Sequence, residues 1–520
     1  MDREKMLKSL SEVAVWDIIV IGGGASGLGC ALDAASRGLK TLLLEQHDFA
    51  KGTSSRSTKL VHGGVRYLQQ GDISLVLEAL RERGLMLQNA PHLVRNLSFI
   101  IPNYDWWGGP FYTLGLKVYD LMAGKLGLGP STKLSLEETT RAIPTLVQKG
   151  LRGGVIYHDG QFDDARMALS LALSCADHGA TVINYMAVTA LTKDKDQLIN
   201  GVLVKNMVDG EEYELKARVV VNATGVWADH ILKMDDANSR KMIRPSQGVH
   251  LVLDASFLQS DHAILIPHTS DGRVLFAVPW HNRVIVGTTD TLVDQSLLEP
   301  RALDEEVDFI LGTAGLYLAK APGKKDIKSI FAGLRPLAAN DGDGKSTKEL
   351  SRHHKIFVSL SGLLTLTGGK WTTYRKMAED AIDKAMMIGG FPGRKSVTEN
   401  LLIHGYTLHF SMAHPHAVYG SDMEAMQALA IEKPEYAGML SEALGISKAQ
   451  LIWAIREEMA VGIEDFLARR TRALFLDARE SINICEAVAH LMAKELNLDE
   501  NWENDQIVKY KAMASAYYFD

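Results

Sequence analysis

A short glycine-rich segment constrains this chain more than any other feature. Residues 16–21 form an apolar run typical of a buried parallel strand, and Gly22, Gly24 and Gly27 follow it in the spacing GxGxxG. A helical segment comes next, and residues 41–44 form a second apolar run. Because amides at the start of a helix bind pyrophosphate, this order predicts a strand–helix–strand unit that binds a dinucleotide.

Each position in this motif has its own physical reason. We expect Gly24 to let the backbone approach the phosphates and Gly27 to let the helix pack closely on the strand. Glu45 ends the second strand, where a carboxylate accepts hydrogen bonds from ribose hydroxyls. A glycine-rich turn in an unrelated α/β protein is the alternative interpretation, and Glu45 by itself is compatible with either NAD or FAD.

Two further small-residue turns favour FAD. One follows the apolar run 219–221, and the other precedes a helical stretch. Their residues are Ala223, Thr224 and Gly225 in the first turn and Gly369, Lys370 and Thr372 in the second. A reductase that uses both NAD and FAD would be expected to carry a second dinucleotide motif, and the sequence has none. The three turns therefore predict one long cofactor, bound by segments far apart in the chain.

Composition and charge exclude several classes of protein. At 520 residues the chain is too long for one core, so we expect two or three domains. The net charge of −7 argues against a general nucleic-acid binder. The three cysteines lie far apart without metal-ligand spacing, so we expect no metal site and a reducing compartment. No apolar run approaches the roughly 18 residues of a membrane-spanning helix, which predicts a protein of the cytosol or of a membrane surface.

Local patterns predict several elements. Residues 48–67 are rich in Gly, Ser and Thr and are expected to form an extended loop at the site. Residues 72–150 look mainly helical. Asp163 is expected to cap the start of another helix, and Ser447 opens a capping box with Gln450. Beyond these, residues 245–295 should form several strands and residues 421–515 should be mostly helical.

Six short blocks of sequence occur in a fixed order. They are Thr53-Ser54-Ser55, Lys59-Leu-Val-His62-Gly63-Gly64-Val-Arg66-Tyr67-Leu68, Asp163-Asp164-Ala-Arg166, Gly287-Thr288-Thr289-Asp290, Gly333-Leu-Arg335-Pro336-Leu337 and Gly368-Gly369-Lys370-Trp-Thr-Thr-Tyr374-Arg375. Together they resemble the FAD-dependent, quinone-linked, aerobic glycerol-3-phosphate dehydrogenases, within the D-amino-acid-oxidase-like FAD oxidoreductase superfamily. The resemblance covers about residues 16–390 and continues more weakly at 464–472.

The resemblance implies a fold and an activity. The fold is α/β, a Rossmann-type FAD-binding domain with an inserted α+β substrate-binding cap and a C-terminal helical domain. The expected bounds are 1–80, 150–245 and 325–395 for the FAD-binding domain, 80–150 and 245–325 for the cap, and 396–520 for the helical domain. The implied activity is oxidation of sn-glycerol 3-phosphate to dihydroxyacetone phosphate by hydride transfer to non-covalent FAD, with electrons passed to a membrane quinone.

The expected location is cytoplasmic, on the inner face of the cell membrane, as a peripheral protein on a lipid surface. The sequence leaves the oligomeric state open, and a homodimer is one alternative. An oxidase of the same fold, which would pass electrons to oxygen and release hydrogen peroxide, is the competing activity. A flavin-binding protein without turnover is a third interpretation, against which the cluster of cations in the expected site argues.

Candidate residues for the cofactor come from the turns and the blocks together. They are Gly22, Gly24, Gly27, Glu45, Thr53, Ser54, Ser55, Lys59, His62, Gly63, Gly64, Ala223, Thr224, Gly225, Gly369, Lys370 and Thr372. For the substrate, the resemblance implies Arg66, Tyr67, His250, Arg335, Arg352 and Lys370, and for catalysis His250, Arg66 and Arg335.

The expected substrate carries a phosphate group and a secondary alcohol that is oxidised, and this chemistry explains the residue types. Arginine binds phosphate through its planar guanidinium, although any single Arg or Lys is more often part of a surface salt bridge. A histidine, whose ordinary pKa is near 7, can serve as general base or hydrogen-bond donor at the C2 hydroxyl, although a lone histidine is more often structural. Arg66 would stabilise the reduced flavin or the developing carbonyl oxygen. Arg352 is followed by His353, where the family often has an acid, so the residue beside Arg352 departs from the family pattern while the positive charge of Arg352 is kept.

Other charged residues are interpreted as structural. Asp163, Asp164 and Arg166 are expected to supply a helix cap and an internal ion pair, and Asp290 to form a turn.

Two segments are candidates for lipid contact. Residues 106–122, with Trp106 and Trp107, would form an interfacial amphipathic helix or a buried helix of the cap. The second candidate is Arg469, Arg470 and Arg472, which would otherwise lie on a solvated helical face.

Overall fold

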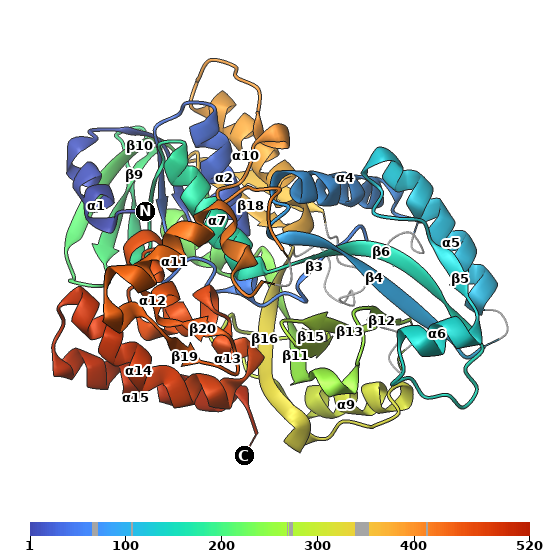
Figure 1. Ribbon diagram of the computed structural model, residues 1–520. Coiled ribbons are helices and arrows are strands. Elements are labelled where there is room, and N and C mark those ends of the chain that lie inside the picture. Colours follow the sequence, from blue (N-terminus) through green and yellow to red (C-terminus); the bar gives the residue numbers. More distant parts are fainter. Residues whose placement is uncertain are drawn as a thin grey trace.

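The computed structural model describes residues 1–64, 71–105, 108–267, 269, 274–338, 353–411 and 414–519, without the side chains of 108–111. Two large sheets and a helical C-terminal region make up this part of the chain (Figure 1). The cavity described below lies between the two sheets, and its lining residues fall between Ile21 and Met377.

The first sheet contains the predicted dinucleotide unit. Its strands follow the order β17-β18-β10-β1-β2-β7, with β9 pairing with β10 and β8 pairing with β9. Their bounds are β1 (Trp16–Ile21), β2 (Thr41–Leu44), β7 (Thr181–Ile183), β8 (Met186–Lys193), β9 (Ile199–Asn206), β10 (Glu212–Asn222), β17 (His354–Val358) and β18 (Leu364–Gly368). β1 pairs in parallel with both β2 and β10, so the predicted strands at 16–21 and 41–44 are confirmed.

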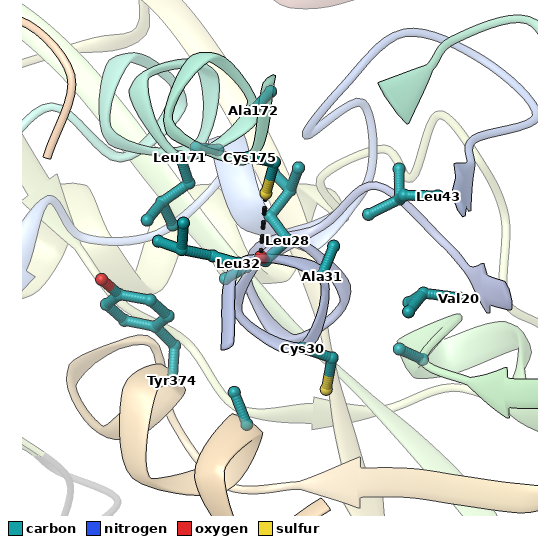
Figure 2. Close-up of a cluster of buried hydrophobic side chains, with 14 of the residues drawn as sticks. Val20, Leu28, Cys30, Ala31, Leu32, Leu43, Leu171, Ala172, Cys175 and Tyr374 are labelled. Carbon is teal, nitrogen blue, oxygen red and sulfur yellow. Dashed lines mark hydrogen bonds between the residues drawn. The ribbon is translucent and has the colours of Figure 1, made fainter. Parts of the chain in front are cut away.

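Helix α2 (Ala25–Ser36) follows β1 and packs between α7 (Asp164–Asp177) and α10 (Tyr374–Ile388). Figure 2 shows Leu28 and Leu32 of α2 among apolar side chains from these helices and from β1 and β2. Two cysteines, Cys30 and Cys175, are buried in this core without forming a disulfide. Helix α1 (Arg3–Glu12) contacts β7, and α8 (Ala228–Asp235) lies after β10.

The second sheet is built around β4 and β11. Its order is β15-β11-β14-β13-β12-β4-β6-β3, with β16 pairing with β11 and β5 with β6. The bounds are β3 (Leu60–Val61), β4 (Val94–Asn103), β5 (Thr132–Leu134), β6 (Gly153–Phe162), β11 (Ile243–Asp254), β12 (Ala263–Ile266), β13 (Leu275–Trp280), β14 (Arg283–Gly287), β15 (Thr291–Leu292) and β16 (Ile327–Ala338). The helices associated with it are α4 (Ile73–Asn89), α5 (Gly108–Ala123), α6 (Leu136–Ala142) and α9 (Asp304–Tyr317).

The expectation that residues 72–150 are mainly helical is wrong at β4 and β5. β4 pairs with β6 along its whole length and buries the apolar run Phe99, Ile100 and Ile101. A short apolar run cannot be assigned to a strand or a buried helix by periodicity alone, and the distant partner β6 decides between them.

The C-terminal region is mostly helical, as expected. It contains α11 (Met423–Glu432), α12 (Lys448–Glu457), α13 (Ala473–Leu476), α14 (Ala478–Leu496), α15 (Glu500–Ala514) and the pair β19 (Met439–Ser441) and β20 (Ile446–Ser447). The predicted capping box at Ser447 is present, as is the cap at Asp163, which accepts from the Arg166 amide. Apolar residues of this region share a core with Trp280 and Phe331 of the second sheet.

The expected domain bounds stay a prediction. Strands β3, β6 and β16 lie within ranges assigned to the FAD-binding domain, yet they pair into the second sheet. Among the described residues, no helix combines the length and the apolar character needed to cross a bilayer.

Candidate active site

A cavity of about 650 Å³ lies at the carboxyl ends of the parallel strands of the first sheet. Its walls come from the turns after β1, β2, β10 and β18 and from parts of β11 and β16. Ligands of open α/β sheets bind at this edge because the turns there bring helix N-termini and small residues together.

The turn after β1 has the geometry of a dinucleotide site. A Cβ atom added to Gly27 would lie 1.9 Å from the carbonyl oxygen of Gly22, so only glycine allows α2 to approach β1 this closely. Gly22 itself has φ +110°, in the region that favours glycine. Gly24 precedes the first residue of α2 and lines the cavity, so the helix N-terminus faces the space where a pyrophosphate would bind. The residues present therefore fit FAD.

Glu45 lines the cavity at the end of β2. Its carboxylate accepts from the amides of Gly23, at 2.6 Å, and His47, at 2.9 Å. Burial raises the pKa of Glu45, and these two amide donors oppose the rise. The turn thus holds the carboxyl group in a fixed orientation beside the cavity.

The second and third turns reach the same cavity from other parts of the chain. The Thr224 hydroxyl donates to Asn222 Oδ1 at 2.8 Å, which fixes the turn after β10. Gly369 has φ +71° and allows the sharp turn before α10. Of the cofactor candidates, those that line the cavity are Gly22, Gly24, Glu45, Thr53, Ser54, His62, Ala223, Thr224, Gly225, Gly369, Lys370 and Thr372.

The remaining cofactor candidates do not line the cavity. Gly27 acts in packing, as described above. Ser55 and Lys59 are buried behind the cavity wall, and the Lys59 ammonium donates to Ser55 O and to Asp164 Oδ2, each at 2.7 Å. Lys59 has φ +63°, and its side chain is fully buried. The Gly63 amide donates to Tyr119 Oη at 2.9 Å, and a Cβ added to Gly63 would lie 2.8 Å from Leu80, so Gly63 packs against α4 and α5, while Gly64 is buried.

Arg335 brings a guanidinium group into the cavity from β16. It donates to Thr289 O at 3.0 Å and to Thr288 Oγ1 at 3.2 Å, and it lies 3.3 Å from Asp290 Oδ1. The neighbouring Gly248 leaves room for this arrangement, because a Cβ there would lie 2.4 Å from Arg335 Nη2. Asp290 was expected only to form a turn, and this is incomplete, since its carboxylate contacts Arg335 and accepts from Ser246 Oγ.

His250 faces the cavity from β11 and is almost fully buried. Its ring stacks on Phe331 with centroids 4.8 Å apart, and its Nε2 shares a 2.8 Å hydrogen bond with Thr58 Oγ1. Burial, and then the charges of Lys59 and Arg335, hold the pKa of His250 well below its usual 6.5. The imidazole is therefore neutral near pH 7 in the ligand-free site.

Three substrate candidates, Arg66, Tyr67 and Arg352, lie outside the described residues, as do Trp106 and Trp107. The others, His250, Arg335 and Lys370, line one cavity together with the cofactor turns. The structure therefore brings both predicted groups of residues to one place.

The arginines at 469, 470 and 472 are neither a lipid contact nor a solvated helical face, so both expectations for them are wrong. All three are buried. Arg469 and Arg470 both donate to Asp48, in the loop after β2, and Arg472 donates to Ser55 O at 2.7 Å. Burial alone would raise the pKa of Asp48, but Arg470 and Arg469 lower it below its usual value.

The internal ion pair predicted near Asp163 exists with other partners than expected. Arg166 pairs with Glu458 of the C-terminal region. Asp164 pairs with Lys59 and Arg472 instead. A spacing rule within one helix cannot find such partners, because each comes from a segment far away in the sequence.

Sequence reasoning missed other residues at the cavity. Thr58, Arg56 and His47 all line it, and none of them belongs to a recognised block. Thr58 directly precedes the block that begins at Lys59, and this position was the one feature of the sequence that could have indicated a place at the site.

Comparisons with known proteins agree with this geometry. Residues 17–375 match the family of FAD dependent oxidoreductases, and residues 364–503 match the C-terminal domain of alpha-glycerophosphate oxidase. The mitochondrial glycerol-3-phosphate dehydrogenase of Bos taurus is 38% identical, over 97% of this chain and 74% of its own length. That of Schizosaccharomyces pombe is also 38% identical, over 96% and 87%.

Solved structures give the same picture. The crystal structure of the glycerol-3-phosphate dehydrogenase from Bacillus halodurans, complexed with FAD, superimposes with a TM-score of 0.81 at 30% identity, over 99% of this chain and 97% of that one. The L-alpha-glycerophosphate oxidase from Mycoplasma pneumoniae shares the fold, with a TM-score of 0.58 at 18% identity, over 75% of this chain and 98% of that one. The α/β fold class and the FAD cofactor predicted from the sequence are thereby confirmed, and the chain belongs to the FAD-dependent glycerol-3-phosphate dehydrogenases, a family of flavoprotein oxidoreductases.

Proposed function

We propose that this chain oxidises sn-glycerol 3-phosphate to dihydroxyacetone phosphate and passes the electrons to a membrane quinone. The observation that carries the proposal is the single cavity in which the dinucleotide turn, His250 and the cations of Arg335 and Lys370 meet. A phosphate dianion and a secondary alcohol need such a site, with fixed cations at one end and a proton acceptor at the other.

Arg335 binds the substrate phosphate in this proposal. Its guanidinium is anchored by the backbone oxygen of Thr289 and the hydroxyl of Thr288, so its direction is set before a ligand arrives. Asp290 lies at its other nitrogen, 3.3 Å away, and balances part of its charge. An arginine held this way offers donors in a fixed plane, which suits two phosphate oxygens. Lys370 adds a second positive charge from the turn before α10.

FAD, when bound, supplies the acceptor for the hydride that leaves C2 of the substrate. The chain's own task is to take the proton of the C2 hydroxyl, and we assign this to the neutral imidazole of His250. Bound phosphate would offset the charge of Arg335, one of the groups that depress the pKa of His250, and so make the ring a better base once substrate is present.

Helix α5 supports a peripheral position on a lipid surface. It buries Tyr112, Leu116 and Tyr119, as expected for a helix of the cap. Its exposed side carries Leu114, 69% exposed, and Leu121, 82% exposed, together with the exposed Lys117. A helix that exposes large apolar residues and a lysine, at the edge of the molecule in Figure 1, suits an anionic bilayer surface that also holds the quinone. We place the protein on the cytoplasmic face of the cell membrane.

Anaerobic mixing tests the chemistry. Glycerol 3-phosphate should bleach the flavin absorbance of the holoenzyme, whereas glycerol should not, and a quinone analogue should restore the oxidised spectrum. Equal bleaching by glycerol would contradict the phosphate site. Reoxidation by oxygen with matching release of hydrogen peroxide, and no faster reaction with quinone, would favour the oxidase instead.

Vesicle flotation tests the surface. Leu114→Ser with Leu121→Ser should reduce binding to vesicles of anionic lipid by roughly tenfold, because two leucine side chains no longer enter the interface. The matched control is Leu316→Ser on α9, which removes a leucine of similar exposure, 72%, from another element. Equal losses in both proteins would contradict the assignment to α5.

A further inference from the structure

The orientation of the His250 ring depends on a residue outside the motifs. Phe331 stacks on the ring, with an angle of 16° between the two planes, and so fixes the ring plane. Stacking leaves open the 180° flip about the Cβ–Cγ bond, which keeps the ring plane and exchanges the positions of the nitrogens and carbons, and a hydrogen bond to a ring nitrogen selects one of the two orientations. Among the described residues, Thr58 supplies that hydrogen bond to Nε2, while Nδ1 is buried without a partner.

A turn of three residues presents the Thr58 hydroxyl. Asp164 Oδ2 accepts from the Ser57 amide at 2.9 Å, from the Ser57 hydroxyl at 2.7 Å and from Lys59 Nζ at 2.7 Å. The Ser57 hydroxyl in turn accepts from the Lys59 amide at 3.0 Å. With Ser57 and Lys59 both bound to one carboxylate, Thr58 between them faces the cavity.

The carboxylate of Asp164 is itself held from the C-terminal region. Arg472 donates to Asp164 Oδ1 at 3.2 Å and to Ser55 O at 2.7 Å, so one guanidinium fixes both the carboxylate and the chain just before the turn. Asp164, Lys59 and Arg472 are all buried. The turn is therefore held by charged groups from the interior of the protein.

We propose that Thr58 is a positioning residue for His250, which it orients through its hydroxyl while the turn bound to Asp164 keeps that hydroxyl in place. The proposal rests on the role of His250 in the proposed function. The charges of Lys59 and Arg335 act on His250, Asp164 lies behind Lys59, and Arg472 contacts Asp164. Proton transfer from the C2 hydroxyl needs a ring nitrogen at a set distance and angle, and a displacement of about 1 Å can cost roughly 100-fold in rate.

A double-mutant cycle tests whether Thr58 acts through His250. Thr58→Val keeps the shape and removes the hydroxyl, and it should lower the anaerobic rate of flavin reduction by about 10- to 100-fold, with FAD content and KM within about threefold of the parent. Thr58→Ser should restore most of the rate. In a His250→Phe background, which keeps a ring on Phe331, Thr58→Val should have no further effect.

A matched control and an independent signal complete the test. Thr145→Val removes a threonine hydroxyl that donates to the backbone carbonyl of Leu258. Neither residue lines the cavity, so this variant should leave the rate unchanged. The ¹³Cε1 NMR signal of His250, assigned by its loss in His250→Phe, should move in Thr58→Val and return in Thr58→Ser. This signal requires no turnover.

Each outcome decides one point. Equal effects of Thr58→Val with and without His250, or an unmoved histidine signal, would overturn the positioning role. Loss of FAD or a large rise in KM would assign Thr58 to ligand binding instead. If glycerol 3-phosphate fails to bleach the unmodified enzyme, the proposed function fails, while the NMR comparison still decides whether Thr58 orients His250.

Discussion

Two groups of arginines in this molecule have opposite environments. Arg335 lies in the cavity, 23% exposed, and its protein partners are 3.0 to 3.3 Å away. Arg469 and Arg470 lie in the interior, and they share the carboxylate of Asp48. The interior pair contacts the carboxylates of Asp48, Glu464, Asp465 and Glu458, whereas Arg335 lies 3.3 Å from Asp290 and lines the cavity. The same type of side chain thus lines a cavity in one place and joins two regions in the other.

The strongest test of this contrast removes the acid from the interior group. Asp48→Asn should remove the carboxylate that both guanidinium groups share, leaving Arg469 with Glu464 and Asp465 and Arg470 with Glu458, and lower the free energy of unfolding by about 3 kcal/mol. Denaturant titration of the holoenzyme measures the change. Asp505→Asn is the control, because its partner Lys509 and the carboxylate are both largely exposed on α15, and a change below about 0.5 kcal/mol is expected there. Similar changes in both variants would contradict a structural role for the interior group.

A substitution in the dinucleotide turn tests whether the cavity binds FAD, and it changes no charged residue. Gly24→Val places a branched side chain where an added Cβ already lies 3.0 Å from Ser54 Oγ, at the start of α2. FAD affinity should fall by roughly 100-fold or more, because the backbone no longer approaches the pyrophosphate. Flavin content after gel filtration measures this. Thermal unfolding of the apoprotein is the control, and a protein that keeps its FAD would contradict the assignment of the turn.

The cavity arginine should affect binding much more than stability. Arg335→Ala should raise KM for glycerol 3-phosphate by about 30- to 100-fold, as expected for a lost charged hydrogen-bond pair, and change FAD content little. Arg335→Lys should recover part of the loss, since it restores the charge but not the planar donors. Steady-state kinetics with a quinone analogue measures both. An unchanged KM would remove Arg335 from the phosphate site.

The sequence predicts an environment well when the interacting residues are close in sequence, and poorly when they are far apart in sequence. The turn at Gly22–Gly27 is stabilised by interactions between residues close in sequence. The sequence predicts it because a side chain at Gly22 or Gly27 would be strained or would clash with neighbouring backbone. The partner that Arg469 and Arg470 share, Asp48, is more than 400 residues away, and no pattern within 464–472 specifies it. Their position beside Phe466, Leu467 and Ala468, all buried, was the available sign of an interior segment.

The candidate site shows the same division. His250, Arg335 and Lys370 were found because a family resemblance supplies the fold that joins them. Thr58 was missed, since its role exists only through His250, in another strand. Strand β4 was missed for a related reason: its apolar run becomes a strand through pairing with β6.

The smallest expected effect concerns a charged contact that is only partly buried. His404 lies between Asp177, at the end of α7, and Asp422, just before α11, at 2.6 and 2.8 Å. Burial lowers its pKa, but the two carboxylates outweigh burial and raise it to about 9. A raised pKa in the folded state means that the contribution to stability is complete below the unfolded value of about 6.5 and is lost as the pH rises through about 9.

His404→Gln should therefore be less stable than the parent by about 1 kcal/mol at pH 6, a value limited by the exposure of Asp177, which is 54%. The difference should disappear by about pH 10, where the histidine is neutral in both folded and unfolded protein. Denaturant titrations at the two pH values measure it. A difference that stays constant with pH would mean that His404 contributes through packing rather than charge, and the contact between α7 and the C-terminal region would then resemble neither the interior arginine group nor the cavity.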